Sequence, residues 1–136
     1  MAEREILFRG KRTYNGKWVE GSLVVTSQCN AYIISTVEDK RDATVLVNQC
    51  SLNVDPETVG QYTGLTDKNG KRIFEGDIIV VEGEKWCVGY DDMRARFALF
   101  HTSWELMRNI PNYCEREVIG NIHDNSKILK GGGENG

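Results

Sequence analysis

The sequence has few of the residues that mark specialised classes of protein. It contains two prolines and two histidines in 136 residues, and no apolar run approaches the ~20 residues that cross a bilayer. Its charged start, residues 1–5, also lacks the apolar core of a signal peptide. We therefore expect a cytoplasmic protein that makes no contact with a membrane.

An excess of positive charge is also missing. Seventeen lysines and arginines stand against twenty acidic residues, so the net charge is -3. A field of this sign does not attract DNA, RNA or an anionic membrane over long distances. Any nucleic-acid site must therefore be a local patch of basic residues.

The four cysteines lack the short spacings of a metal site. They are widely scattered, without a Cys-x-x-Cys pair, and the histidines His101 and His123 are the only sources of ring nitrogen. We expect reduced, free thiols, no metal and no cofactor, and the thiols in question are Cys29, Cys50, Cys87 and Cys114.

Residue groups typical of catalysis are poorly represented. Between Gly64 and Lys71 the glycine spacing is one residue too long for a phosphate-binding loop, and Arg72 stands where the magnesium-binding Ser or Thr belongs. His123 beside Asp124 has no neighbouring nucleophile, which favours a structural hydrogen bond. The acidic pairs, Glu82 with Glu84 and Asp91 with Asp92, have the surroundings of solvated turns. We expect no catalytic residues and no enzyme activity.

Short strands dominate what is present. Fourteen glycines and 40% hydrophobic residues accompany runs of β-branched and aromatic residues, and helical signals are limited to about two turns near residues 103–107 and 125–130. We expect an all-β fold, a small barrel with SH3-like elements, forming one domain over residues 1–126 with a flexible tail at 127–136. The expected strands cover residues 6–8, 31–35, 43–47, 84–90, 95–101 and 118–122.

Two Asn-Gly pairs mark hairpins. Asn15-Gly16 and Asn69-Gly70 are each flanked by strand-like residues, and Asn-Gly is typical of the type I′ turn, in which both central residues have positive φ. Residues 15–25 and 69–80 also share a pattern of turn, short strand, Glu-Gly break and apolar strand. The pattern fits either an internal repeat or a chance likeness of two hairpins.

Three ordered blocks of sequence resemble the YopX family of phage and prophage proteins. The central block runs Val54-Asp55-Pro56-Glu57-Thr58-Val59-Gly60-Gln61-Tyr62-Thr63-Gly64-Leu65 and continues through Asp67-Lys68-Asn69-Gly70-Lys71 to Ile73-Phe74-Glu75-Gly76-Asp77-Ile78-Ile79. The outer blocks lie at residues 8–23 and 117–125. The resemblance implies a β-rich fold that contains a barrel, an origin in a phage or prophage, and self-association, but no activity.

Basic and aromatic residues interleave near the start of the chain. Residues 1–25 carry five basic and three acidic residues, and further basic residues flank the second Asn-Gly turn. Two basic tips with aromatics between them fit a groove for single-stranded nucleic acid, or else core aromatics beside solvated cations. The candidate nucleic-acid residues are Arg9, Lys11, Arg12, Lys17, Trp18, Lys71 and Arg72.

These observations favour a binding role over catalysis. The leading hypothesis is a binding or assembly module that acts through protein contacts as a homo-oligomer, with a host or phage partner that the sequence does not identify. The alternative is a nucleic-acid-binding accessory protein that uses the basic hairpin tips.

Overall fold

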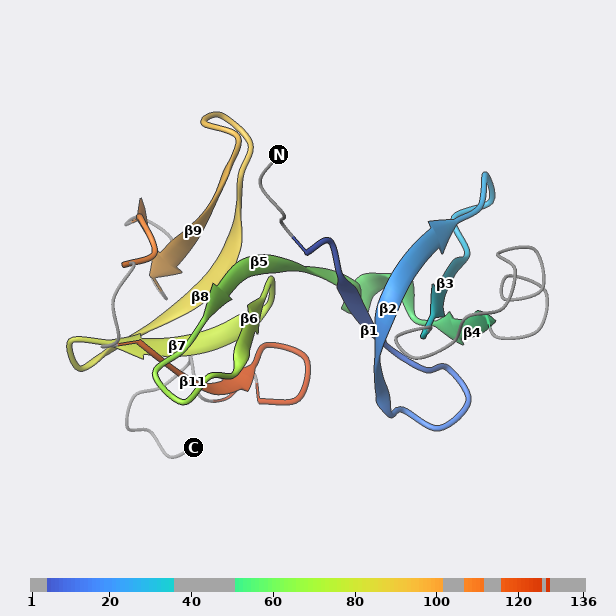
Figure 1. Cartoon of the computed structure of the whole chain (residues 1–136), viewed down its shortest axis with the longest axis horizontal. Coiled ribbons are helices and arrows are strands. Elements are labelled where there is room, and N and C mark those ends of the chain that lie inside the picture. The colour runs from blue at the N-terminus through green and yellow to red at the C-terminus, as the bar shows by residue number, and fades with distance from the viewer. Residues whose placement is uncertain (1–4, 36–50, 102–106, 112–115, 126, 128–136) are drawn as a thin grey trace. The chain divides into compact units, whose positions relative to one another are not determined.

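A computed structural model describes residues 5–35, 51–101, 107–111, 116–125 and 127 (Figure 1). The described residues form an all-β fold with one short 3-10 helix, η1, and they divide into two compact units, Met1–Tyr62 and Thr63–Gly136. The strands are β1 (Phe8–Lys11), β2 (Trp18–Val25), β3 (Ala31–Ile34), β4 (Ser51–Val54), β5 (Gly60–Thr66), β6 (Arg72–Phe74), β7 (Asp77–Val81), β8 (Glu84–Asp91), β9 (Arg96–His101), β10 (Met107–Arg108) and β11 (Glu117–Asn121), and η1 spans Pro56–Thr58.

The first unit is a curled antiparallel sheet with the order β4-β3-β2-β1-β5. Strand β2 bends at Gly21: its first half pairs with β1 and its second half with β3. A Cβ atom at Gly21 would lie 2.1 Å from the carbonyl oxygen of Ile34, so only glycine fits this bend. The core of this unit contains Ala31, Ile33 and Val54, with Phe8, Val19, Leu23 and Val59 packed against them.

The end of β4 returns to the end of β1. Arg12 forms an isolated bridge with Val54, and the Asp55 N–H donates to the Lys11 carbonyl. Gly10 leaves room for Val54, whose side chain would lie 3.0 Å from a Cβ atom at position 10. The sheet therefore curls strongly, but the strands that the structure describes form two antiparallel sheets and no closed barrel, so the expected small barrel is not confirmed.

The second unit contains a sheet with the order β10-β9-β8-β7-β11, together with β6 and the end of β5, which pair with each other. Its core is aliphatic and aromatic, and a β-bulge between Val118 and Gly120 interrupts β11. The core residues are Ile73, Ile79, Val81, Trp86, Val88 and Leu99, with Leu65, Ile110 and Val118 packed against them.

Both Asn-Gly pairs form hairpin turns, but the expected type I′ geometry is wrong. Gly16 and Gly70 have positive φ, 71° and 81°, whereas Asn15 and Asn69 do not. In the second turn the Asp67 carboxylate accepts hydrogen bonds from the backbone N–H groups of Asn69 and Lys71, which favours a three-residue loop.

A two-residue loop with the geometry expected of Asn-Gly occurs elsewhere, between β7 and β8. Val81 pairs with Glu84, and both intervening residues, Glu82 and Gly83, have positive φ, 54° and 82°. Type I′ geometry thus occurs at a Glu-Gly pair. The first residue of the pair, Glu82, is not of a type that tolerates positive φ well.

The two similar sequence segments differ in structure. Gly21 lies inside the continuous strand β2, whereas Gly76, with φ of 93°, forms the turn between β6 and β7. The Glu-Gly pair therefore marks a change of partner strand in one segment and the end of a strand in the other. The shared sequence pattern therefore does not correspond to a shared local structure, and the internal repeat stays a prediction.

Most of the other strand predictions are confirmed. Strands β3, β8, β9 and β11 lie where they were expected, and β1 begins at Phe8, two residues later than expected. The expected strand at 43–47 and nearly all of the tail at 127–136 lie outside the described residues. So does the expected helical turn at 103–107, apart from Met107, which begins strand β10. Strands β4 and β10 were not predicted, and the single domain over residues 1–126 stays a prediction.

Candidate binding surfaces

Five of the seven candidate nucleic-acid residues lie on the hairpin of β1 and β2. Lys11 pairs directly with Trp18, and Arg9 lies two residues earlier, so the three side chains share one face of the sheet. The opposite face carries Phe8 and Val19, which pack into the core. We call Arg9, Lys11, Arg12, Tyr14, Lys17 and Trp18 the basic hairpin.

Trp18 is covered by cations rather than presented as an open ring. The Arg9 guanidinium carbon lies 4.7 Å from the Trp18 ring centroid and the Lys11 Nζ lies 5.7 Å from it. Arg9 is itself only 8% exposed. These cation–π contacts hold the base of the hairpin together and leave Trp18 half-buried.

Tyr14 is the exposed aromatic residue of the basic hairpin. Its side chain is 85% exposed at the end of the loop, and the Arg12 guanidinium carbon lies 5.7 Å from its ring centroid. The Arg12 Nε is buried and has no hydrogen-bond partner, and no described residue forms an ion pair with Arg12. The loop therefore carries a cation and an aromatic ring whose binding capacity is largely unused.

The other two candidate residues, Lys71 and Arg72, lie on the hairpin of β5 and β6 in the second unit. Asp67 reduces the positive charge of this hairpin, and Lys68 forms an ion pair with Glu117 at 3.4 Å. Burial would raise the pKa of Asp67, but hydrogen bonds from the N–H groups of Val118, Lys71 and Asn69 and the charge of Lys71 lower it below its ordinary value. The expected groove between the two basic tips stays a prediction.

A second exposed tip, which the sequence analysis missed, joins β8 to β9. Met93 is 90% exposed and Tyr90 is 45% exposed, and Tyr90 forms an edge-to-face pair with Phe97 at 5.3 Å between ring centroids. We call Tyr90, Met93, Arg94 and Phe97 the apolar tip. The sequence does carry a signal for this tip, since a tyrosine and a phenylalanine flank a short turn.

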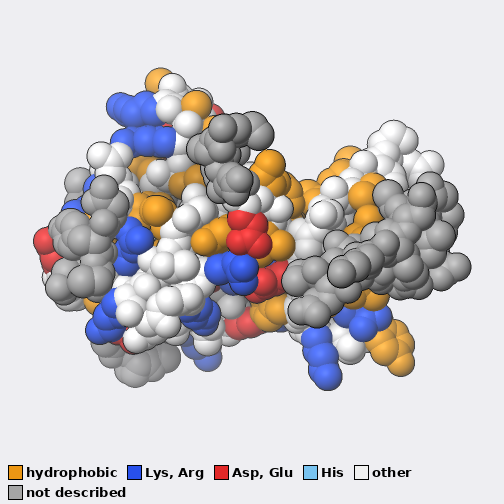
Figure 2. All heavy atoms as spheres, viewed as in Figure 1, with side chains coloured by type: hydrophobic (Ala, Val, Ile, Leu, Met, Phe, Trp, Pro, Cys, Tyr) orange, Lys and Arg blue, Asp and Glu red, His pale blue; other side chains and the backbone are white. Residues whose placement is uncertain are grey.

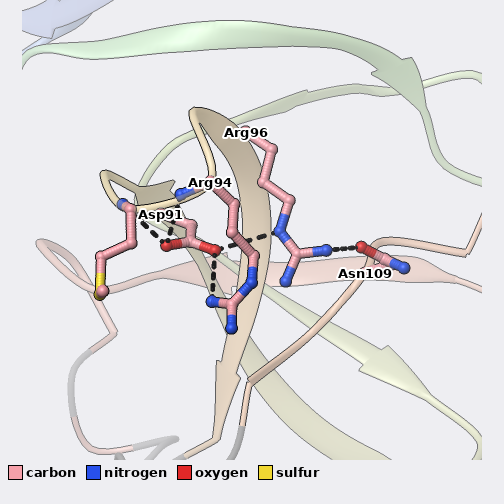
Figure 3. Close-up of polar contacts among 5 residues, drawn as sticks. Asp91, Arg94, Arg96 and Asn109 are labelled. Carbon is pink, nitrogen blue, oxygen red and sulfur yellow. Dashed lines mark hydrogen bonds and ion pairs between the residues drawn. The ribbon is translucent and has the colours of Figure 1, made fainter.

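Asp91 holds the apolar tip in one conformation (Figure 3). Its carboxylate is 5% exposed and accepts hydrogen bonds from the backbone N–H groups of Met93 and Arg94. It also forms ion pairs with Arg94 at 3.2 Å and Arg96 at 3.1 Å, and Arg96 donates in turn to Asn109. The expectation that Asp91 lies in a solvated loop is therefore wrong.

These contacts set the charge state of Asp91. Burial would raise the pKa of its carboxyl group, but the hydrogen bonds from Arg96, Arg94 and the backbone outweigh burial and lower the pKa below its ordinary value. Asp91 is thus a charged structural group that fixes the turn.

The remaining acidic and histidine candidates serve separate local contacts. Glu82 faces Arg108 at 3.5 Å and Glu84 faces His101 at 3.4 Å, so these two carboxylates do not share a site. His123 and Asp124 are exposed in a turn after β11, where Asn121 Oδ1 accepts hydrogen bonds from the backbone N–H groups of both.

The two described cysteines are free thiols, as expected. Cys29 is exposed, whereas Cys87 is buried and burial raises its pKa to about 11, which makes it a poor nucleophile at neutral pH. Cys50 and Cys114 lie outside the described residues. Within the described part of the chain, no group of three His, Cys, Asp or Glu residues is arranged to hold a metal, and no helix is long and apolar enough to span a membrane.

Together, the fold and these surfaces define an all-β protein whose two most exposed large apolar or aromatic side chains among the described residues, Met93 and Tyr14, lie on hairpin tips. The chain belongs to the YopX family, because the family model described as YopX protein matches residues 7–130. The resemblance stated from the sequence is thus confirmed.

Comparison with solved structures supports the same fold. The crystal structure of protein EF1440 from Enterococcus faecalis is similar, with a TM-score of 0.60 and 24% sequence identity, over 94% of this chain and 100% of that chain. At this identity the similarity concerns the fold alone. Comparison with curated proteins gave no match.

Proposed function

We propose that the chain is a non-catalytic binding and assembly module that acts through protein contacts and forms a homo-oligomer. The observation that carries the proposal is the apolar tip, where Met93 is 90% exposed on a turn held by the buried Asp91. Apolar, aromatic and arginine side chains are typical of the centres of protein interfaces. A turn that is already ordered loses little conformational entropy when a partner binds.

The roles of the buried carboxylates support binding rather than catalysis. Asp67, Asp77 and Asp91 are all buried, and each accepts a hydrogen bond from at least one backbone N–H group of its own turn. These carboxylates replace the hydrogen bonds that the turning backbone cannot make with itself. Their oxygens therefore stabilise the hairpins and are not available for acid–base chemistry.

The proposed setting follows from the family. A phage or prophage origin and a cytoplasmic location are part of the proposal, and the partner is a second copy of the chain or a protein of the phage or its host. A partner of this kind would meet the apolar tip with an apolar surface of its own, because Met93 and Tyr90 offer few hydrogen-bonding groups.

Light scattering at micromolar concentrations tests the proposal. We expect a mass above the 15.4 kDa of one chain, and a shift towards the monomer when Met93→Ser is introduced. Val25→Ser is the matched control, since Val25 is also exposed, at 58%, but lies outside the apolar tip. A mass of one chain at every concentration, or equal effects of the two variants, would count against assembly through this tip.

A further inference from the structure

The basic hairpin concentrates positive charge on an acidic protein. The segment from Phe8 to Trp18 contains four basic residues and no acidic residue, whereas the whole chain has a net charge of -3. Figure 2 shows cationic and hydrophobic side chains together on the loop between β1 and β2, at the lower right of the view. A local positive field of this kind suits an anionic ligand even though the molecule as a whole repels one.

The cations on the loop are not neutralised by the described residues around them. Arg12 and Lys17 form no ion pair with any described residue, and the Arg12 Nε is buried without a hydrogen-bond partner. The Arg12 Nε is closed to solvent, so it is the unpaired charges of Arg12 and Lys17, on a partly exposed loop, that favour a ligand. Charge-assisted hydrogen bonds to phosphate are among the strong ones, so these charges point to a ligand rich in anionic oxygen.

The aromatic residue beside these cations specifies the ligand further. Tyr14 is 85% exposed, and its ring is held next to the Arg12 guanidinium at 5.7 Å. An exposed ring flanked by cations is suited to stacking a planar base while the cations contact the phosphates on either side. Bases of a duplex are already stacked and do not reach such a ring, so a single strand fits better.

We infer that the basic hairpin binds single-stranded nucleic acid, with a base stacked on Tyr14 and the neighbouring phosphates contacted by Arg12 and Lys17. Arg9, Lys11 and Trp18 form the support: their cation–π contacts fix the base of the hairpin and add positive charge behind the loop. This inference uses a different surface from the apolar tip and stands independently of the proposed protein contacts.

Fluorescence anisotropy of a labelled single-stranded thymidine oligonucleotide, and of the matching uridine RNA, tests the inference. We expect binding at low salt that weakens as salt rises, with a slope of log affinity against log salt of about -2 for about three phosphate contacts. Tyr14→Ala is expected to weaken binding about tenfold or more, because one stacked base is lost. Arg12→Ala should weaken binding and flatten the salt dependence.

Matched variants separate this site from general electrostatics. Val25→Ala and Lys127→Ala remove an exposed apolar side chain and an exposed lysine that belong to neither the basic hairpin nor the apolar tip, and both should leave the affinity unchanged. Tyr14→Phe keeps the ring and should bind as the natural chain does. Circular dichroism of each variant confirms that the sheet is intact.

Several outcomes would overturn the inference. One is the absence of binding to either oligonucleotide at low salt, and another is binding that Tyr14→Ala and Arg12→Ala leave unchanged. Equal or tighter binding of a duplex would exclude single-strand stacking. Polyglutamate that competes as well as the oligonucleotide would assign the hairpin to acidic proteins instead. Loss of affinity in Lys71→Ala with Arg72→Ala, but not in Arg12→Ala, would place the site on the other hairpin.

Discussion

Single residues in the left-handed region of φ store strain in the hairpin turns. Glu82 and Ala95 have φ of 54° and 55°, and both lie in turns of the second unit. A residue with a Cβ atom loses about 1–2 kcal/mol in this region relative to its preferred conformation. Asparagine and glycine usually occupy such positions, but positions 82 and 95 hold a glutamate and an alanine.

Ala95→Gly is expected to raise the free energy of unfolding by about 0.5–1 kcal/mol, because glycine adopts the left-handed region without a clash. Ala98→Gly is the matched control: Ala98 is fully buried in β9, where glycine should lower stability by about 1 kcal/mol. Urea unfolding of the two variants measures both effects. A loss of stability in Ala95→Gly would contradict the strain at this turn.

Asp91 is expected to make stability depend on pH in the acidic range. Its pKa is lower in the folded chain than in the unfolded chain, so the unfolded chain takes up a proton more readily. The stabilisation is therefore complete above the ordinary carboxyl pKa of about 4 and is lost as the pH falls through the lower, folded value.

Urea unfolding at a series of pH values checks this prediction. Asp91→Asn should be less stable near neutral pH and should show a smaller fall in stability towards acid, whereas Asp92→Asn, on the exposed neighbouring residue, should follow the natural chain. Equal acid sensitivity in the natural chain and Asp91→Asn would show that the carboxylate does not carry the effect.

At the scale of elements, hairpins were predictable in position but not in geometry. Asn-Gly pairs and alternating apolar residues are local signals, and they placed the turns at Gly16 and Gly70 and the strands β3, β8, β9 and β11 correctly. The geometry of the turn at Gly70 depended on Asp67, whose second oxygen accepts a hydrogen bond from the Val118 N–H of β11. Contacts so distant in sequence leave no local pattern.

The candidate sites also differ in whether neighbouring residues or residues distant in sequence determine them. The basic hairpin was visible because its cations and aromatic residues are close in sequence, although Trp18 proved to be covered and Tyr14 exposed. The apolar tip was missed because Asp91 looked like an ordinary surface residue of a turn. In the fold its carboxylate is paired with Arg96, which donates in turn to Asn109, 13 positions further along the chain.

Gly21→Ala tests the bend of β2 at the scale of the strand. The added Cβ would meet the Ile34 carbonyl oxygen at 2.1 Å, so the strand cannot change partner at this point without moving the backbone, and we expect a loss of about 3 kcal/mol or more. Gly16→Ala is the control, because position 16 has open space and only a positive φ, which costs about 1–2 kcal/mol. Equal losses in urea unfolding would contradict the close approach at Gly21.

At the scale of the whole molecule, the chain consists of two compact units that share the strand β5 in sequence. The prediction of a single domain over residues 1–126 concerns how cooperatively these units unfold. Each unit has its own core, and the three tryptophans divide between them, Trp18 in the first and Trp86 and Trp104 in the second. With Trp104 replaced by phenylalanine, Trp18 and Trp86 can report on the units separately.

We expect one cooperative unfolding transition, with coincident midpoints for the two units. Fluorescence of the double variants Trp18→Phe with Trp104→Phe and Trp86→Phe with Trp104→Phe, each compared with circular dichroism of the same variant, measures the midpoints. Two transitions that differ in midpoint between the probes would show that the units fold as separate domains.

If the apolar tip binds a protein partner, position 93 should lie against that partner. Photo-crosslinking from a reactive side chain introduced at position 93, with position 25 as the control, measures this contact. We expect crosslinks between position 93 and a second copy of the chain, mapped by mass spectrometry, and far fewer from position 25. Crosslinks confined within one chain, or equal yields from both positions, would contradict it.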